Sequence, residues 1–355
     1  MFNMNPETQK KIRRFKGIKR GYYSFVILIG LLSLTSICEL IANSRALLVS
    51  YQGTLYFPIY SAFHPGTDFG LDYPYETNYR ELKQKFLNEG GDNWLVMPLV
   101  QYNPYENNAQ NNVFRPAAPS LSKGHYLGTD TTSRDILSRL IYGTRIALWF
   151  ALAFTLSVYA LGIVIGCAMG YFGGLFDLIF QRFIEIWSNI PFLYMVIIVF
   201  SVIPSGFPTS TRIGLLLFVM VLFSWTSITY YMRTETYREK SRDYVSAARI
   251  MGASNLRIIF RHILPNALST LITFVPFTVI SSITAITALD FLGFGLPPPT
   301  PSLGELLKQG TGSLRTAPWI VISAFGTLVI LLTLITFVGE AIRESFDPKK
   351  FTIYK

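Results

Sequence analysis

The sequence predicts an all-α integral membrane protein with six transmembrane helices and a long extramembrane insert between the first two. Half of the 355 residues are hydrophobic and only 15% are charged, whereas a soluble domain carries about 25% charged residues. The apolar residues gather in runs near the roughly 20 residues that span a bilayer, and helices are expected because they satisfy their own backbone groups in lipid. The runs lie at about 21–41, 146–171, 178–204, 212–231, 267–290 and 317–339.

The first run follows a polar segment, residues 1–20, that holds seven Lys or Arg against one acid, Glu7. A basic stretch before an apolar one also describes a signal peptide. This run is long, Glu39 lies near its end, and no convincing A-x-A cleavage site follows. We therefore expect an uncleaved transmembrane helix.

The insert, residues 43–143, is hydrophilic and rich in Tyr, Asn, Pro and Gly, with eight Lys or Arg and nine Asp or Glu. We expect a compact element of little regular structure, with Trp94, Phe57 and Phe69 as candidates for a small core. Among the later runs, 178–204 is the least regular, because Asn189 and Pro191 interrupt it.

Basic residues predict the orientation. With six spans, one side of the membrane holds seven Lys or Arg in residues 1–20, one at Arg182, seven in 233–262 and four from Arg343 onward, nineteen in all. The other side, without the insert, holds four: Arg145, Arg212, Lys308 and Arg315. Long loops translocate largely regardless of charge, so the insert is excluded. The count predicts cytoplasmic termini and an external insert.

The expected organisation is a cytoplasmic N-terminus (1–20), transmembrane helix 1 (21–42), a periplasmic insert (43–143), a transmembrane core (144–342) with a loop at 234–266, and a cytoplasmic tail (343–355).

The cytoplasmic loop predicts two short amphipathic helices with a corner between them. Tyr244, Ala247, Ala248 and Met251 repeat at helical spacing, and Leu256, Ile259, Phe260 and Ile263 do so again. Gly252 can adopt a positive φ that ends the first helix, and Ser254 is a good N-cap for the second. Pro265 is expected to separate the second helix from the next span. Such a compact, basic loop favours docking to a cytoplasmic partner over an idle position at the lipid surface.

This loop resembles the EAA loop of bacterial ABC importer permeases, in which Glu-Ala-Ala precedes a Gly by four residues and a Leu-Pro follows. Ser246 stands where that pattern has Glu, and His262 where it has Ile. The loop is most similar to the dipeptide and oligopeptide branch. The resemblance assigns the following residues to ATPase coupling: Asp243, Tyr244, Ala247, Ala248, Arg249, Gly252, Ala253, Ser254, Arg261, His262, Leu264 and Pro265.

Three further segments look like the same branch: the stretch 125–145, which begins His125-Tyr126-Leu127-Gly128-Thr129-Asp130; Phe291-Leu292-Gly293-Phe294-Gly295 with the prolines after it; and Trp319. The insert, with Glu39-Leu40-Ile41-Ala42-Asn43 and Tyr56-Phe57-Pro58, is similar to permeases of the microcin C peptide importer kind.

The resemblance implies the type I ABC importer permease fold and a bacterial inner-membrane subunit that carries peptides, including microcin C-like peptides. It also implies its partners: a second permease, two ATP-binding subunits or one fused ATPase, and a periplasmic peptide-binding protein. ATP and Mg²⁺ are then bound by the ATPase, and no cofactor or metal is expected on this chain.

Other classes fit the sequence less well. The net charge of +10 lies beside apolar runs rather than on a basic stripe, which argues against nucleic acid. No G-x-x-x-x-G-K-[ST] sequence is present to bind ATP. The three histidines, His64, His125 and His262, lie far apart without metal-ligand spacing, and Gly-x-Ser-x-Gly is absent, so an enzyme is not expected.

An ion-coupled secondary transporter of small solutes is the alternative. Glu185 and Asp290 lie in or at the ends of spans, where acids are costly and often functional. We prefer an interfacial position for both. In the fifth span Thr270, Thr273, Ser281 and Thr284 share a helical face; they are candidates for a translocation path, or equally for close helix packing.

Overall fold

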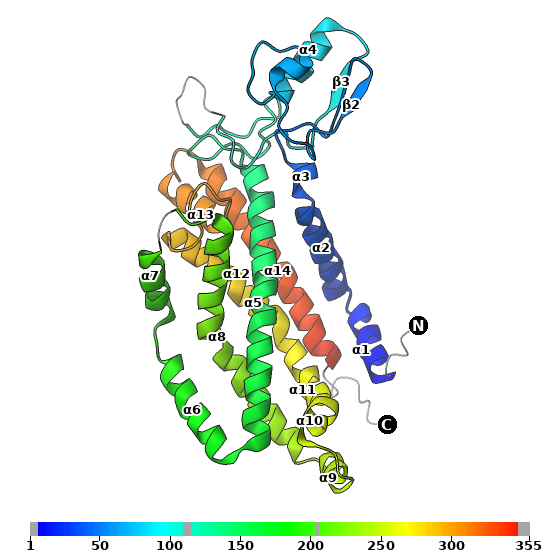
Figure 1. Ribbon diagram of the computed structural model, residues 1–355, viewed down its shortest axis with the longest axis vertical. Helices are drawn as coiled ribbons and strands as arrows, with labels where there is room; N and C mark the ends of the chain where they lie inside the picture. The colour runs from blue at the N-terminus through cyan, green and yellow to red at the C-terminus, as the bar shows by residue number, and fades with distance from the viewer. Residues whose placement is uncertain (1–5, 109–114, 204–205, 347–355) are drawn as a thin grey trace.

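The computed structural model describes residues 6–108, 115–203 and 206–346. Figure 1 shows a tall helical bundle with a small lobe at one end, and α1 and α9 toward the other end. The helices and strands of the lobe and the first span are α1 (Pro6–Gly17), α2 (Lys19–Ser36), α3 (Cys38–Ile41), β1 (Leu48–Tyr51), β2 (Thr54–Tyr56), η1 (Gly66–Phe69), α4 (Tyr79–Glu89) and β3 (Trp94–Val96). The bundle continues with α5 (Ile136–Phe172), α6 (Gly174–Ser188), α7 (Phe192–Val202), α8 (Thr209–Lys240), α9 (Asp243–Ile250), α10 (Asn255–Ile258), η2 (Ile259–Ile263), α11 (Leu264–Leu271), η3 (Ile272–Phe274), α12 (Val275–Leu292), α13 (Leu303–Gly312) and α14 (Pro318–Phe346).

The all-α membrane class is confirmed. Within the described ranges four helices are long and apolar enough to cross a membrane, and there are six spans if two bent helix pairs each count as one. The pairs are α1 with α2, bent by 97°, and α6 with α7, bent by 72°. The second bend lies at Asn189 and Pro191, the residues that interrupt the apolar run.

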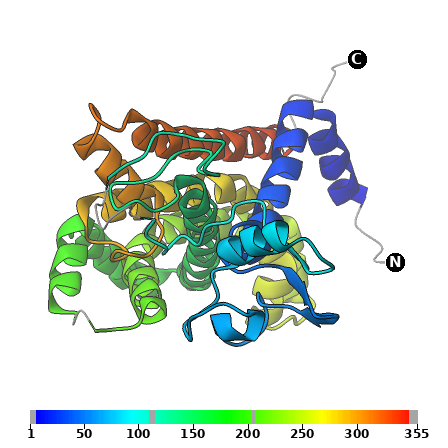
Figure 2. The same cartoon turned by 90° about the horizontal axis from the view of Figure 1, so that it is seen from above.

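Close packing of α5 against α8 forms the centre of the bundle. A Cβ at Gly162 would lie 2.7 Å from the Ile228 side chain, and one at Gly166 would lie 2.6 Å from the Thr229 carbonyl oxygen. Gly170 makes the same approach one turn further on, so a glycine at every fourth position lets the two backbones meet, as is common between membrane helices. Figure 2 shows α5 near the middle, with α6, α7 and α8 on one side and α1 and α2 on the other.

The insert is more regular than expected. Its strands form an antiparallel sheet of order β2-β1-β3, with α4 packed against it. Phe69 is fully buried with Tyr79, Leu82 and Phe86, so its predicted core role is confirmed. The other two anchors were wrong: Trp94 and Phe57 are exposed.

Two predicted boundaries also differ. The helix that we expected from 144 begins at Ile136, because the Asp135 side chain caps it by accepting from the Ser138 N–H. Pro265 does not separate the loop from the next span, since one helix runs from Asn255 to Leu292. A π-helical turn at Ile259–Ile263 precedes the proline, which stands in the first turn of α11 and therefore continues the helix.

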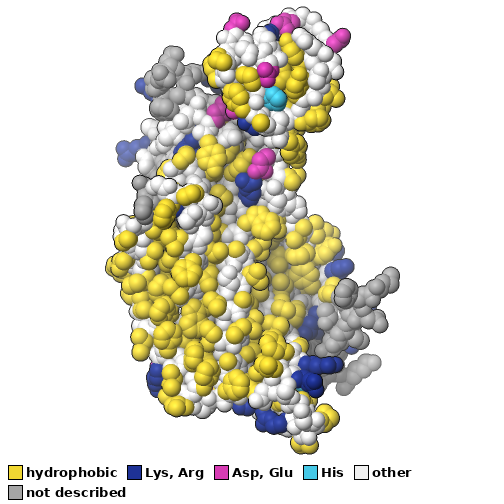
Figure 3. Space-filling view, in the orientation of Figure 1, with side chains coloured by type: hydrophobic (Ala, Val, Ile, Leu, Met, Phe, Trp, Pro, Cys, Tyr) yellow, Lys and Arg dark blue, Asp and Glu magenta, His cyan; other side chains and the backbone are white. Residues whose placement is uncertain are grey.

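Along the long axis, the surface is polar at one end, apolar in the middle and polar again at the other end. Hydrophobic side chains cover the middle of the face in Figure 3, Lys and Arg gather toward the end that holds α9, and Asp and Glu toward the insert. α1 and the end of α14 lie toward the same end as α9, as the six-span arrangement requires.

Candidate functional site

The loop between α8 and α11 forms the predicted pair of helices with a corner. α9 ends in a Schellman motif: the Gly252 N–H donates to the Arg249 carbonyl and the Ala253 N–H to the Ala248 carbonyl, both at 3.0 Å. Gly252 has a φ of +79°, which permits this ending. The Ser254 hydroxyl oxygen then accepts from the Arg257 N–H and caps α10. The local signals at Gly252 and Ser254 were therefore interpreted correctly.

The apolar side chains of the loop divide between the interior and the surface. Val245, Ala248, Ile258, Ile259 and Ile263 are buried against the bundle. Ile250 and Met251 are 87% and 80% exposed, and Leu256 and Phe260 are exposed beside them. We call these four the apolar knob. Of the face predicted for the first helix only Ala248 is buried, and Ala247 and Met251 are exposed.

Hydrogen bonds hold the loop rigidly to the spans. The Tyr244 hydroxyl donates to Glu239 of α8 at 2.5 Å and accepts from the Asn266 amide at 3.1 Å. Burial raises the pKa of Tyr244, and the hydrogen bond to Glu239 raises it further. The hydroxyl therefore remains a donor at neutral pH. The Tyr171 hydroxyl donates to the Asn255 side chain at 2.7 Å. The loop is therefore hydrogen-bonded to α5, α8 and α11.

The remaining residues assigned to coupling lie on or beside this loop. Asp243, Ala247, Arg249, Arg261 and Pro265 are exposed, and Ala253, His262 and Leu264 are half-buried. The His262 ring lies 6.4 Å from the Tyr244 ring, and its backbone carbonyl accepts from the Asn266 amide at 2.9 Å. The structure thus brings all twelve to one end of the bundle.

A cavity of about 430 Å³ lies between α5, α7, α8 and α12. Its polar lining consists of Ser224, Ser227 and Tyr231 from α8, and Thr278, Ser281 and Ser282 from α12. The rest is mainly aromatic and aliphatic, and no charged residue lines it among those that the structure places. Ser227, Tyr231 and Ser281 are exposed, so the cavity opens on the side of the chain.

Only Ser281 of the four predicted path residues lines this cavity. Thr273 and Thr284 donate to carbonyls of their own helix, at 2.6 and 2.9 Å, and Thr270 also lies outside the lining. The hydroxyls of α8 were missed. Their signal was present, because Ser224, Ser227 and Tyr231 share one helical face at positions i, i+3 and i+7.

The hydroxyl of Ser282 is buried and has no hydrogen-bond partner within the described ranges. A buried hydroxyl without a partner costs about 1–3 kcal/mol. Ser282 lies in the cavity lining, but its hydroxyl oxygen is buried beneath the cavity surface.

The motif segments noted in the sequence meet at the opposite end of the bundle. Arg139 is fully buried, forms an ion pair with Glu305, and donates to the carbonyls of Pro299 at 3.1 Å and Pro104 at 3.0 Å. The Trp319 indole N–H donates to the Thr129 carbonyl at 3.2 Å. These contacts join the start of α5 to α13 and to the segment before α13, and the start of α14 to the segment before α5.

The two intramembrane acids are engaged in local bonds. A carboxylate oxygen of Asp290 accepts from the Leu296 N–H at 2.7 Å, which holds the turn after α12. Glu185 accepts from Arg182 at 2.6 Å on the surface of α6. Neither lines the cavity, and no observation favours the secondary transporter.

A helical membrane bundle with an exposed, hydrogen-bonded loop at one end and an uncharged cavity fits a transport permease, and sequence comparison gives the family. Residues 162–352 match the family described as binding-protein-dependent transport system inner membrane component. The chain belongs to this family, and it is therefore a membrane subunit with the type I importer permease fold rather than the ATPase.

Relatives match over almost the whole length. The chain is 42% identical to the inner membrane ABC transporter permease protein YejE of Escherichia coli, covering 99% of both chains. It is 39% identical to the peptidoglycan transport system permease protein YejE of Agrobacterium fabrum, covering 98% of this chain and 94% of the relative. It is 35% identical to the dipeptide transport system permease protein DppC of Haemophilus influenzae, covering 72% of this chain and 86% of the relative.

Proposed function

We propose that this chain is the membrane-spanning permease of an ABC importer that carries peptides across the bacterial inner membrane. The observation that carries the proposal is that one rigid loop joins the two helices, α8 and α12, whose hydroxyls line the cavity. Relatives named for dipeptide and peptidoglycan transport support the choice of cargo. Peptide fragments of peptidoglycan and microcin C-like peptides both belong to the proposed cargo class.

The proposed coupling follows from how the loop is held. An ATPase that binds the apolar knob and closes on ATP displaces α9 and α10. Tyr244 transmits this displacement to α8 and α11, because its hydroxyl is hydrogen-bonded directly to Glu239 of α8 and to Asn266 of α11. The cavity walls then shift between inward-open and outward-open arrangements. ATP and Mg²⁺ are bound on the partner, as two ATP-binding subunits or one fused chain.

The lining suits a peptide of variable sequence. Hydroxyls donate to and accept from a peptide backbone, whereas the absence of charge from the lining avoids selecting side chains of one sign. The cavity opens laterally, so a second permease facing it is needed to enclose the path. We therefore propose a heterodimer of permeases.

The insert is proposed to receive the periplasmic peptide-binding protein. It lies at the end of the bundle opposite the loop. Its surface exposes aromatic residues, among them Tyr60, Tyr75 and Trp94, and such residues are enriched at protein interfaces. The alternative is that the insert braces the second permease.

The experiment is purification of the intact complex from membranes, identification of its subunits, and reconstitution in vesicles. We expect an ATPase and a second permease to co-purify, and labelled tripeptide uptake to require internal ATP and the binding protein. Uptake that a proton gradient drives without ATP would contradict the proposal.

A further inference from the structure

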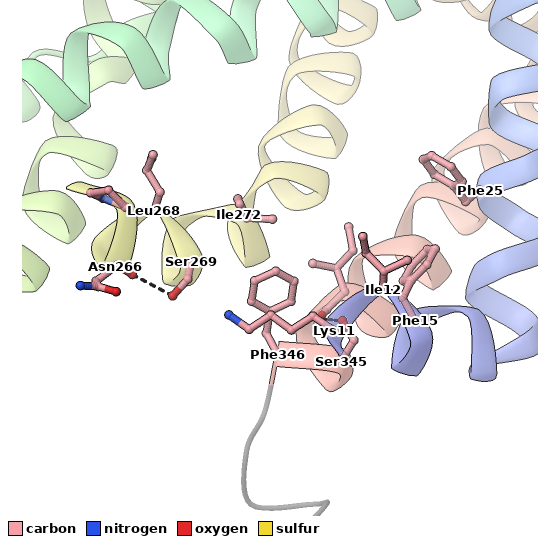
Figure 4. A pocket seen from close by; sticks show the side chains of 12 residues that line it. Lys11, Ile12, Phe15, Phe25, Asn266, Leu268, Ser269, Ile272, Ser345 and Phe346 are labelled. Atoms are coloured by element: carbon pink, nitrogen blue, oxygen red, sulfur yellow. Dashed lines mark hydrogen bonds between the residues drawn. The ribbon is translucent and has the colours of Figure 1, made fainter. Parts of the chain in front are cut away.

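A second cavity, of about 610 Å³, lies where α1, α2, α11 and α14 meet (Figure 4). Its wall is mostly apolar: Ile12, Phe15, Phe25, Leu268, Ile272 and Phe346. Ile12, Phe25 and Ile272 are exposed in the described chain. The cavity lies at the α9 end of the bundle and is separate from the one between α5, α7, α8 and α12.

One rim of this cavity is polar. Lys11, Asn266, Ser269 and Ser345 contribute to the lining. The Lys11 side chain runs along the Phe346 ring, with its ammonium nitrogen 4.4 Å from the ring centre, and it points across the cavity toward α11 in Figure 4. The Ser269 and Ser345 hydroxyls donate to carbonyls of their own helices, at 2.7 and 2.8 Å, so the Lys11 ammonium is the cationic group of this rim. A cation at one edge of an apolar wall matches an amphiphile with a phosphate at its head.

The surroundings favour a negative headgroup. α1 carries Lys10, Lys11, Arg13, Arg14 and Lys16, and it turns by 97° from α2. A basic helix turned across a membrane-spanning one lies along the lipid surface, where it attracts anionic lipids. The apolar wall meanwhile continues into the spans, at the depth of acyl chains.

We propose that this cavity binds one anionic phospholipid of the cytoplasmic leaflet, with its phosphate at Lys11 and an acyl chain between Phe25 and Ile272. Asn266 lies on the same rim and also holds Tyr244, so the headgroup touches the joint between the coupling loop and α11. The leaflet rests on the proposed orientation, whereas binding itself does not.

The test uses the full chain in nanodiscs with a photoreactive phosphatidylglycerol probe, and a phosphatidylcholine probe of the same chain length. Lys11→Gln is compared with Lys10→Gln, which removes the same charge from the next residue, an exposed one outside the cavity. Ser269→Trp fills the polar rim without changing charge and provides a second, independent variant.

We expect phosphatidylglycerol to label peptides from α1, α11 and the end of α14. Labelling should fall about fivefold in Lys11→Gln, as for the loss of one cation near an anionic head, and likewise in Ser269→Trp, but not in Lys10→Gln. Equal loss in both lysine variants would show general surface attraction and overturn the site. Equal labelling by phosphatidylcholine, or unchanged labelling in Lys11→Gln and Ser269→Trp, would overturn it too. None of these outcomes depends on peptide transport.

Discussion

Tyr244 and Asn266 are hydrogen-bonded at 3.1 Å, and this contact joins the two ends of the loop between α8 and α11. Tyr244 stands in the first turn of α9 and Asn266 in α11, so the bond joins the start of the loop to the helix that leads to the cavity. The same hydroxyl donates to Glu239 of α8. One side chain of α9 therefore links α8 to α11, which continues into α12.

Tyr244→Phe should weaken coupling. The substitution keeps the ring and removes the bonds to Glu239 and Asn266, each worth about 1 kcal/mol. We expect peptide uptake to fall relative to ATP hydrolysis, while the ATPase still co-purifies. Asn266→Ala should give a similar loss, and the double variant should lose less than the sum of the two. Fully additive losses would contradict a direct link.

The topology is tested with a reporter that is active only in the periplasm. Nineteen Lys or Arg on one side against four on the other predict cytoplasmic termini. A fusion at Lys355 should be silent, and an insertion near Asn108, beyond the end of β3, should be active. The reverse pattern would exclude the predicted orientation.

Ser281→Val tests the translocation cavity. It removes a hydroxyl from the lining and adds apolar bulk, so we expect peptide uptake to fall about fivefold or more, with ATPase assembly unchanged. Thr284→Val is the matched control, because that hydroxyl bonds to the Ile280 carbonyl of its own helix and lies outside the lining. Equal effects of the two changes would argue for helix packing instead.

The two ends of the insert lobe lie next to each other, so the lobe can be deleted. The Asn43 N–H donates to the Val100 carbonyl at 3.0 Å, so residues 44–98 can be replaced by a short Gly-Ser linker across neighbouring ends. Pro104, whose carbonyl accepts from buried Arg139, remains. We expect assembly with the ATPase to survive, and uptake and stimulation by the binding protein to fall. If both survive, the lobe has a bracing role only.

The sequence predicts well what local chemistry decides. The spans follow from apolar runs, and the corner of the loop from Gly252 and Ser254, because each signal acts over a few residues. It did not bring Ser281 and Ser227 to one cavity, since that depends on how α8 and α12 both pack against α5. The glycines of α5 that allow α8 to approach have their partners 60 or so positions away along the chain, beyond any local pattern. Pro265 wrongly indicated a break before the next span, because a π-helical turn before it keeps the helix continuous.

The insert shows the same division. Phe69, Trp94 and Phe57 are all large and apolar enough to build a core, and only packing of α4 on the sheet selects Phe69. The meeting of Trp319 with Thr129 was likewise invisible, since it joins segments that no local pattern connects. Resemblance to a family marked both segments without saying that they touch.

The central claim is that the loop whose corner is at Gly252 couples this chain to an ATPase, and Gly252→Asp tests it most directly. With φ at +79° a side chain costs about 1 kcal/mol or more, and no other atoms lie within 4 Å of its Cβ, so the bundle itself should fold normally. The acid also stands beside the exposed Met251. The measurement is ATPase co-purification together with ATP-dependent peptide uptake, at equal amounts of membrane-inserted protein. We expect both to be lost; normal uptake by a well-expressed Gly252→Asp chain would contradict the account.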